Sequence, residues 1–255
     1  GFEDYDLSSL RNFQYGGGPM PRSVVEAALK AFPCTMIQGY GQTEGMTMTF
    51  LSQEDHQRAV AGDHPERLGS CGREGFVSEI RVVDPEGEPV PRDGQTAGEI
   101  VVRSEANMLG YWRRPDLTEQ TIRGEWMWTG DIATWDKEGY VFIVDRAKDM
   151  IISGGENIYS TQVEAAIHQH PAVLESAVFG IPDDTWGEAV KAVVVLKPGQ
   201  TATEEEIIAE ASKHLASYQK PKSVDFVEAL PKAPTGKILK RDLRDPYWQE
   251  ETRQV

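Results

Sequence analysis

A lysine near the end of the chain is a candidate for binding an anionic group. The segment 232-KAPTGKILKRD-242 places Lys237 directly after a Thr-Gly pair and before an apolar Ile-Leu pair. Such a lysine either begins a helix in solvent or directs its ammonium toward an anionic group. The chain has a formal net charge of −15, yet seven basic and three acidic residues lie between Lys220 and Arg244. This local positive charge favours a small anionic ligand, and a solvated lysine-rich face is the alternative.

A second candidate site is the segment 39-GYGQTEG-45, which follows a short apolar stretch that predicts a buried strand. Open α/β sheets bind ligands at the carboxyl ends of their strands. Here the glycines would let a flat ring approach the backbone, Tyr40 offers a stacking face, and Thr43 can donate to a phosphate. Glu44 is a hard oxygen ligand suited to Mg²⁺. The alternative is an ordinary glycine-rich turn with a surface glutamate.

Two later segments carry polar residues next to apolar strands. In 128-WTGD-131, Asp131 can accept hydrogen bonds from two vicinal ribose hydroxyls, as acidic residues do in other nucleotide sites. An aspartate that only closes a turn is the alternative. The segment 145-DRAKDMIISGGENI-158 is interpreted as a hinge, with Arg146 on a sugar or phosphate. Exposed charges on a linker are the alternative there.

The elements that must position these residues change character along the chain. Residues 1–66 show a strand–turn–helix–strand pattern typical of the end of an α/β layer. Residues 67–147 alternate apolar and polar side chains between turn signals, which predicts a small antiparallel sheet or partial barrel with a hairpin over 135–145. Residues 148–255 predict a mobile α+β domain.

Two helix starts are predicted in this last domain by the capping-box pattern, a Ser or Thr followed three residues later by Glu. One begins at about Thr161, with Glu164 as the acidic partner, and the other begins at Thr203, with Glu206. Strands are expected over 173–179, 189–196 and 224–227. The overall fold class is therefore α/β plus α+β.

Composition excludes several classes of protein. With 39% hydrophobic and 26% charged residues, the 255-residue chain has the make-up of a folded soluble protein. The acidic net charge argues against nucleic acid or an anionic membrane surface as partner, and no apolar run is long enough to span a bilayer. The two cysteines, Cys34 and Cys71, make no disulfide framework and have no metal-ligand spacing, so we expect a cytoplasmic protein. Homo-oligomerisation stays open.

The order and spacing of these motifs resemble the adenylate-forming superfamily: acyl- and aryl-CoA synthetases, luciferases and the adenylation domains of nonribosomal peptide synthetases. The resemblance covers residues from about Asp6 to Arg244, and within the family it is to medium- or long-chain fatty-acyl or aryl CoA ligases. The segments that carry it are 39-GYGQTEG-45, 98-GEIVVRSEANMLGYW-112, 128-WTGD-131, 145-DRAKDMIISGGENI-158 and 234-PTGKILKRDLR-244.

The resemblance implies a site for ATP or AMP and Mg²⁺. Adenine would lie along the backbone of the Gly16 segment and stack on Tyr40, while Asp131 and Arg146 hold the ribose. Thr43 would contact the α-phosphate and Glu44 the magnesium ion. The nucleotide-binding residues implied are Gly16, Gly17, Gly18, Gly39, Tyr40, Gly41, Asp131 and Arg146.

The resemblance also implies the second half-reaction and its moving parts. Gly154 and Gly155 match the loop that lines the pantetheine tunnel for coenzyme A, and Trp186 matches a tunnel aromatic. Lys148 falls at the pivot between the two domains. Lys237 matches the catalytic lysine of adenylation, acting with Thr43 and Glu44.

The implied activity is that of an acid–thiol ligase of fatty acid metabolism. A carboxylic acid, expected to be a medium- or long-chain fatty acid, attacks the α-phosphate of ATP, and Lys237 offsets the charge that develops. Domain alternation about Lys148 then exposes the acyl-AMP to the thiol of CoA. Two alternatives remain: delivery of the acyl group to a carrier protein, and a non-catalytic remnant that only binds nucleotide.

The sequence contains no Ser/Thr/Gly-rich phosphate loop of the kind T-S-G-T-T-G-x-P-K-G, which the family needs for ATP. The resemblance therefore implies the C-terminal portion of a ligase, with the N-terminal half as a missing partner. We expect residues 1–255 alone to release little pyrophosphate from ATP in a carboxylate-dependent assay. Robust turnover without an added half would contradict this expectation.

Overall fold

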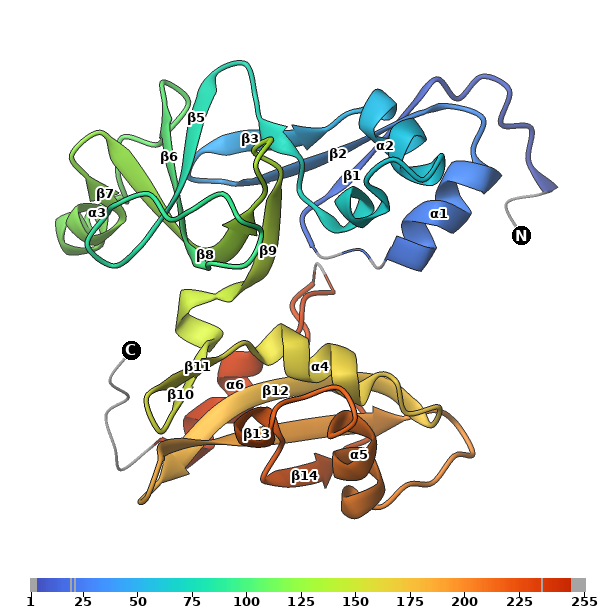
Figure 1. The fold of residues 1–255 in the computed structure, drawn as a ribbon, viewed down its shortest axis with the longest axis vertical. Helices are drawn as coiled ribbons and strands as arrows, with labels where there is room; N and C mark the ends of the chain where they lie inside the picture. The colour runs from blue at the N-terminus through green and yellow to red at the C-terminus, as the bar shows by residue number, and fades with distance from the viewer. Residues whose placement is uncertain (1–3, 19, 21, 235, 249–255) are drawn as a thin grey trace. The chain divides into compact units, whose positions relative to one another are not determined.

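The computed structural model describes residues 4–18, 20, 22–234 and 236–248 (Figure 1). Internal contacts divide the chain into two compact units, residues 1–143 and residues 144–255. Among the residues that the structure describes, none of the helices combines the length and the apolar character that a membrane span requires. Both cysteines are free thiols; Cys71 is buried and Cys34 is partly exposed.

The first sheet of unit 1 is four-stranded, with the order β1-β2-β3-β4. β1 and β2 are parallel, and the other neighbours are antiparallel. A small apolar core of Val25, Ala59 and Leu68 packs beside it. The strands and helices of this part are β1 (Asn12–Gly16), α1 (Arg22–Ala31), β2 (Thr35–Gln42), β3 (Met46–Leu51), α2 (Gln53–Val60) and β4 (Arg73–Glu74), with a 3-10 helix over Pro65–Gly69.

The second sheet of unit 1 confirms the predicted antiparallel sheet and its hairpin. Its order is β5-β6-β8-β7, with β9 paired to β8. Alternating residues of β5, β6 and β8 face one buried cluster, which also includes Tyr40 and Met48 from the first sheet. The two sheets therefore share a core. The elements are β5 (Ser78–Val83), β6 (Gly98–Ser104), α3 (Pro115–Thr121), β7 (Ile122–Arg123), β8 (Trp126–Trp135) and β9 (Val141–Arg146).

Unit 2 is built on a five-stranded sheet of order β11-β10-β13-β12, with β14 parallel to β13. Its strands and helices are β10 (Ile151–Ser153), β11 (Glu156–Ile158), α4 (Ser160–Ile167), β12 (Val173–Asp183), β13 (Gly187–Leu196), α5 (Glu204–Ala211), β14 (Ser223–Phe226) and α6 (Lys240–Arg244). Short 3-10 helices cover Ala147–Asp149, Ser217–Gln219 and Asp245–Tyr247.

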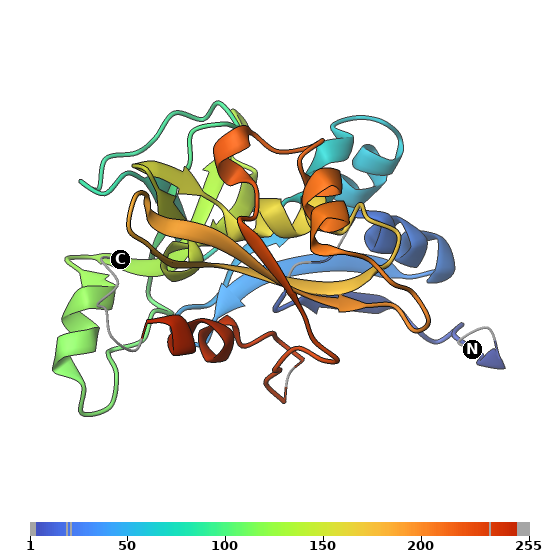
Figure 2. The same ribbon diagram turned by 90° about the horizontal axis from the view of Figure 1, so that it is seen from below.

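Both faces of this sheet are covered. Helices α4 and α5 pack on the face that carries Val178, Val190 and Val194. The opposite face carries Phe179 and Val193, which contact Ile238 and Leu243 of the C-terminal segment. Figure 2 shows α6 on the side of the sheet away from α4 and α5. The segment that contains Lys237 is therefore anchored on its own face of the sheet.

One of the two predicted capping boxes is correct and one is wrong. Thr203 accepts from the backbone N–H of Glu206, whose carboxylate accepts from the N–H of Thr203. At α4, by contrast, the N-cap is Tyr159 and no side chain caps the helix. The Thr161 hydroxyl donates instead to the carbonyl of Val144, and Glu164 is bonded elsewhere. At Thr161 and Glu164, both side chains therefore bond to residues outside the helix and do not cap it.

Replacement of Thr203 by alanine should lower the free energy of unfolding of unit 2 by about 1 kcal/mol, because the N–H of Glu206 loses its acceptor at the start of α5. Urea unfolding followed by circular dichroism measures this change. Thr201→Ala, at an exposed position before the helix, is the matched control and should have little effect. Equal losses in the two variants would contradict the capping role.

Candidate functional site

The segment 39–45 lies partly inside a strand. The prediction that it follows a strand is wrong in its boundary, because β2 continues to Gln42 and only residues 43–45 form the turn to β3. The β2–β3 register shifts between Tyr40 and Gly41. A Cβ at Gly41 would lie 1.9 Å from the carbonyl oxygen of Met46. Glycine is therefore required at this position by the close approach of β3.

Tyr40 and Asp131 form a buried pair that joins the two sheets of unit 1. The Tyr40 hydroxyl donates to Oδ2 of Asp131 over 2.7 Å, and the two residues are 8% and 4% exposed. Burial, and then the charge of Asp131, raise the pKa of Tyr40, so this hydroxyl keeps its proton. The sequence predicted separate roles for these residues, a stacking ring and a ribose acid. Their direct contact had no signal in the sequence.

Asp131 is held in place within β8, at a point where the pairing of β6 and β8 is irregular. The backbone N–H of Asp131 donates to Oγ1 of Thr129 over 3.2 Å, and the Thr129 hydroxyl donates to the carbonyl of Ile100 over 2.8 Å. Gly130 between them has a φ of +72°, which glycine adopts without strain. Its N–H donates to the carboxylate of Glu99, whose pKa is raised by burial. The carboxylate of Asp131 is thus oriented by the backbone of β8 and by Tyr40.

Glu44 is positioned by a residue that the sequence analysis did not single out. The hydroxyl of Tyr111 donates to Oε1 of Glu44 over 2.9 Å, and the N–H of Met108 donates to the Glu44 carbonyl over 2.6 Å. Tyr111 lies in the segment 98–112, which the sequence identified as a motif. Its contact with Glu44 could not be predicted from that motif. Thr43 next to it is exposed. The segments 39–45 and 98–112 are therefore in contact at the Glu44 carboxylate.

The donor set at Glu44 suits a magnesium ion that is shared with a phosphate-bearing substrate. No cluster of three or more His, Cys, Asp or Glu residues occurs among the residues that the structure describes. Mg²⁺ is usually held by one or two carboxylates, several waters and substrate phosphates, and does not require an all-protein cage. Glu44 has a second carboxylate oxygen in addition to the one that Tyr111 contacts.

The glycines at the end of β1 lie beside the segment 39–45. Gly16 pairs with Gly39 in the parallel register of β1 and β2. A Cβ at Gly16 would lie 2.1 Å from the carbonyl oxygen of Gly39, and Gly17 has a φ of +77°. Gly18 follows as an exposed residue. Unit 1 thus brings Gly16 to Gly18, the segment 39–45 and Asp131 to one end of the parallel strand pair.

In unit 2, the predicted tunnel residues lie together. Gly154 and Gly155 form the turn between β10 and β11, with φ values of +61° and +84°. The N–H of Gly154 donates to the carbonyl of Trp186 over 2.8 Å, and a Cβ at Gly154 would lie 2.8 Å from the indole. The Trp186 side chain is 51% exposed. The glycine turn therefore packs against an accessible aromatic ring.

The segment around Arg146 and Lys148 forms the single turn Ala147–Asp149 after β9. The N–H of Arg146 donates to the Asp145 carboxylate over 2.8 Å. Arg244 donates to the carbonyl of Lys148 over 2.9 Å and lies 3.5 Å from the carboxylate of Asp149. Helix α6 therefore contacts the predicted hinge residue directly.

Lys237 lies on a short looped segment before α6. The N–H of Ala233 donates to the carbonyl of Lys237 over 2.8 Å, and the N–H of Leu239 donates to the carbonyl of Pro231 over 2.9 Å. Lys237 is exposed and precedes the first residue of α6, so it does not begin that helix. Thr235, part of the quoted motif, lies outside the described residues.

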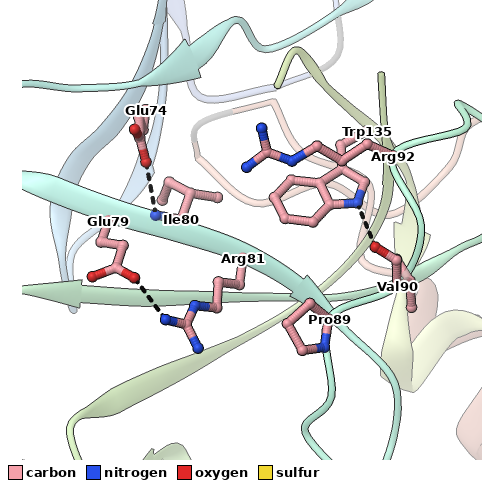
Figure 3. Close-up of a pocket in the computed structure, with 8 residues that line it drawn as sticks. All are labelled: Glu74, Glu79, Ile80, Arg81, Pro89, Val90, Arg92 and Trp135. Carbon is pink, nitrogen blue, oxygen red and sulfur yellow. Dashed lines mark hydrogen bonds and ion pairs between the residues drawn. The ribbon is translucent and has the colours of Figure 1, made fainter. Parts of the chain in front are cut away.

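A surface hollow of about 570 Å³ in unit 1 contains none of the predicted site residues (Figure 3). Its polar groups bond to one another: Arg81 donates to Glu79 over 2.9 Å, and the Trp135 indole N–H donates to the carbonyl of Val90 over 3.0 Å. The guanidinium of Arg92 stacks on the Trp135 ring at 4.3 Å. Because these polar groups bond to one another, we assign the hollow a structural role.

Comparison with known proteins assigns the chain to a family. Residues 1–112 match the family described as AMP-binding enzyme, and residues 162–237 match the AMP-binding enzyme C-terminal domain. A feruloyl-CoA synthase from Amycolatopsis sp is 44% identical over 239 residues, which are 94% of this chain and 47% of that protein. A fatty acid–[acyl-carrier-protein] ligase, ScoC of Streptomyces coeruleorubidus, is 38% identical over 251 residues, 98% of this chain and 47% of that protein.

A solved structure agrees with these matches. The amide bond synthetase McbA from Marinactinospora thermotolerans superposes with a TM-score of 0.82 at 37% identity, over 96% of this chain and 49% of that chain. The chain spans about half the length of the curated relatives it matches. Both family domains occur here in order, in an α/β plus α+β fold shared with these enzymes. The chain belongs to the adenylate-forming superfamily of AMP-binding enzymes.

Proposed function

We propose that these residues belong to an ATP-dependent acid–thiol ligase, which converts a carboxylic acid to acyl-AMP and then to acyl-CoA. The observation that carries the proposal is that two bonds in unit 1 join the segment 39–45 to two other motifs: Tyr40 bonds to Asp131, and Tyr111 bonds to Glu44. Family membership supplies the reaction class. The substrate is proposed to be a fatty or aryl acid, since the relatives' names include both kinds.

In this proposal unit 1 binds the nucleotide. The carboxylate of Asp131 would accept from the ribose hydroxyls, with Arg146 as a further ribose contact. The backbone of the Gly16 segment and the edge of Tyr40 would border the adenine. Tyr40 is largely buried, so its contribution to stacking would come from a limited part of the ring.

The phosphates would lie beside the turn after β2. The exposed hydroxyl of Thr43 would donate to the α-phosphate, and Glu44 would hold Mg²⁺ with its free oxygen. When bound, the ion would withdraw negative charge from the phosphate oxygens. Tyr111 keeps the Glu44 carboxylate turned toward this place, because it occupies the other oxygen.

Lys237 would act on the first step. A carboxylate oxygen attacks the α-phosphorus as the bond to pyrophosphate breaks, and negative charge gathers between the acid and the phosphate. An exposed ammonium on a short loop can lie against both oxygens and offset this charge. In the second step, the CoA sulfur attacks the acyl carbonyl, AMP leaves and the thiol proton is released. Gly154, Gly155 and Trp186 would border the pantetheine arm, and Lys148 would be the pivot between the two steps.

Delivery to a carrier protein is the second candidate function, favoured by the name of the relative ScoC. Both functions share the adenylation step and differ only in the thiol that accepts the acyl group. Incubation of preformed acyl-AMP with CoA, or with a phosphopantetheinylated carrier protein, separates them. Thioester formation with CoA alone is the expected result, and transfer to the carrier alone would replace our proposal.

Loss of the Lys237 ammonium should affect the two half-reactions differently. In a full-length ligase that contains this sequence, Lys237→Ala should lower adenylation about a hundredfold or more, since one charge-stabilising group contributes about 3 kcal/mol to such a step. Thioester formation from supplied acyl-AMP should be largely retained. Acid-dependent pyrophosphate exchange and acyl-CoA formation measure the two steps. Equal losses in both would count against the assignment.

The Tyr40–Asp131 bond should matter for both stability and nucleotide affinity. Tyr40→Phe removes a donor from a buried carboxylate, which costs about 1–3 kcal/mol of unfolding free energy. It should also weaken ATP binding by roughly tenfold, equivalent to about 1.4 kcal/mol, because Asp131 is no longer oriented.

The control for that variant is Tyr140→Phe, which removes the hydroxyl that donates to Asp55 elsewhere in unit 1. It should destabilise the unit to a similar extent and leave ATP affinity unchanged. Calorimetric titration with ATP and chemical unfolding separate the two effects. Similar losses of ATP affinity in both variants would mean that Tyr40 acts only through stability.

A further inference from the structure

Lys240 makes two bonds at the point where the Lys237 segment enters α6. Its ammonium donates to Oγ of Ser160 over 2.6 Å and lies 2.7 Å from Oε1 of Glu164. The Lys240 and Glu164 side chains are only 14% and 19% exposed. A lysine held in this way differs from the solvated lysines of the same segment, because leaving its partners unpaired is costly.

The partners of Lys240 are themselves fixed to the core of unit 2. Glu164 accepts from the N–H of Val178 in β12 over 2.8 Å. Ser160 donates through its hydroxyl to the buried Asp145 over 3.0 Å, and its N–H contacts the same carboxylate. Burial raises the pKa values of both Asp145 and Glu164, and the charge of Lys240 opposes these shifts. One ammonium thus serves two carboxylates, one of them through Ser160.

The described residues of the segment from Pro231 to Leu239 bond in part to one another. These backbone hydrogen bonds join Ala233 to Lys237, Gly236 to Ala233 and Leu239 to Pro231. Ile238 packs on the sheet, and Lys232 at the other end pairs with Glu175 in a more exposed position. The bonds of Lys240 therefore attach the end of this segment to unit 2 in a less exposed place than the Lys232–Glu175 pair at its start.

We propose that Lys240 is a positioning residue for the first half-reaction: through Ser160 and Glu164 it fixes the segment that carries Lys237. This inference rests on the proposed role of Lys237. Lys240 itself need not touch substrate. Because Asp145 directly precedes Arg146 and the predicted hinge, the same bonds would keep Lys237 in a fixed relation to the pivot. A displacement of about 1 Å in a catalytic group can cost as much as a hundredfold in rate.

The test combines two measurements. In the full-length ligase, Lys240→Met should lower adenylation by roughly ten- to a hundredfold, and leave thioester formation from supplied acyl-AMP unchanged. Lys237→Ala/Lys240→Met should be no slower than Lys237→Ala alone, since a residue that acts only through Lys237 has no effect once the ammonium is gone. In the 255-residue chain, hydrogen exchange at the Ala233 and Leu239 amides should become faster.

Two further variants keep the test decisive. Lys213→Met, which removes an exposed ion pair with Glu210 on α5, is the control and should change neither readout. If Lys240→Met does not fold, Glu164→Gln removes the charge of the partner and keeps an acceptor for the Val178 N–H. It should slow adenylation in the same direction, by a smaller factor.

Three results would overturn the inference: no change in adenylation, equal losses in both half-reactions, or a further loss in the double variant equal to that of Lys240→Met alone. Each would assign Lys240 to stability only. The proposed function fails in a different way, when Lys237→Ala itself leaves adenylation intact. Faster exchange at Ala233 and Leu239 would then still show that Lys240 holds the segment, without a catalytic consequence.

Discussion

The hydrogen bond from Tyr40 to Asp131 is the interaction on which unit 1 depends. It joins β2 of one sheet to β8 of the other, between residues 91 positions apart in the chain, and both partners are buried. The loss of a donor to a buried carboxylate is costly, so the bond favours a fold that keeps this tyrosine beside this aspartate. The bond also fixes the direction in which the other oxygen of Asp131 can accept. Stability and the proposed nucleotide site therefore use the same pair of side chains.

In unit 2, the main structural requirement of the proposal is that the exposed Lys237 be held in a fixed position. A short segment with a glycine at positive φ has little stiffness of its own. Helix α6 supplies the anchor, with Lys240 bonded toward α4 and Arg244 bonded to the turn around Lys148. The five residues of α6 thereby connect the core of the unit to two functional parts. These are Lys237, proposed for catalysis, and the turn around Lys148, proposed as the pivot.

Several features were predictable because their causes are local. The helix at Thr203 followed from a capping box whose two reciprocal bonds lie within four consecutive residues, and the antiparallel sheet followed from alternating apolar residues and turn signals. The same box at Thr161 failed because Val144, Val178 and Lys240, all distant in sequence, bond its two side chains. Motif order identified the family and nominated Tyr40 and Asp131 separately. Their contact, and the roles of Tyr111 and Lys240, depend on tertiary pairing that no local pattern encodes.

The central claim is that Lys237 reaches the phosphates of a nucleotide held by Tyr40, Thr43 and Asp131. Affinity labelling with 5′-fluorosulfonylbenzoyl adenosine tests it directly, because the adenosine would bind unit 1 while the sulfonyl fluoride takes the place of the phosphates. In the full-length ligase, peptide mass spectrometry should find the label on Lys237, and excess ATP should prevent the labelling. ATP-sensitive labelling of other lysines, with Lys237 unmodified throughout, would contradict the account.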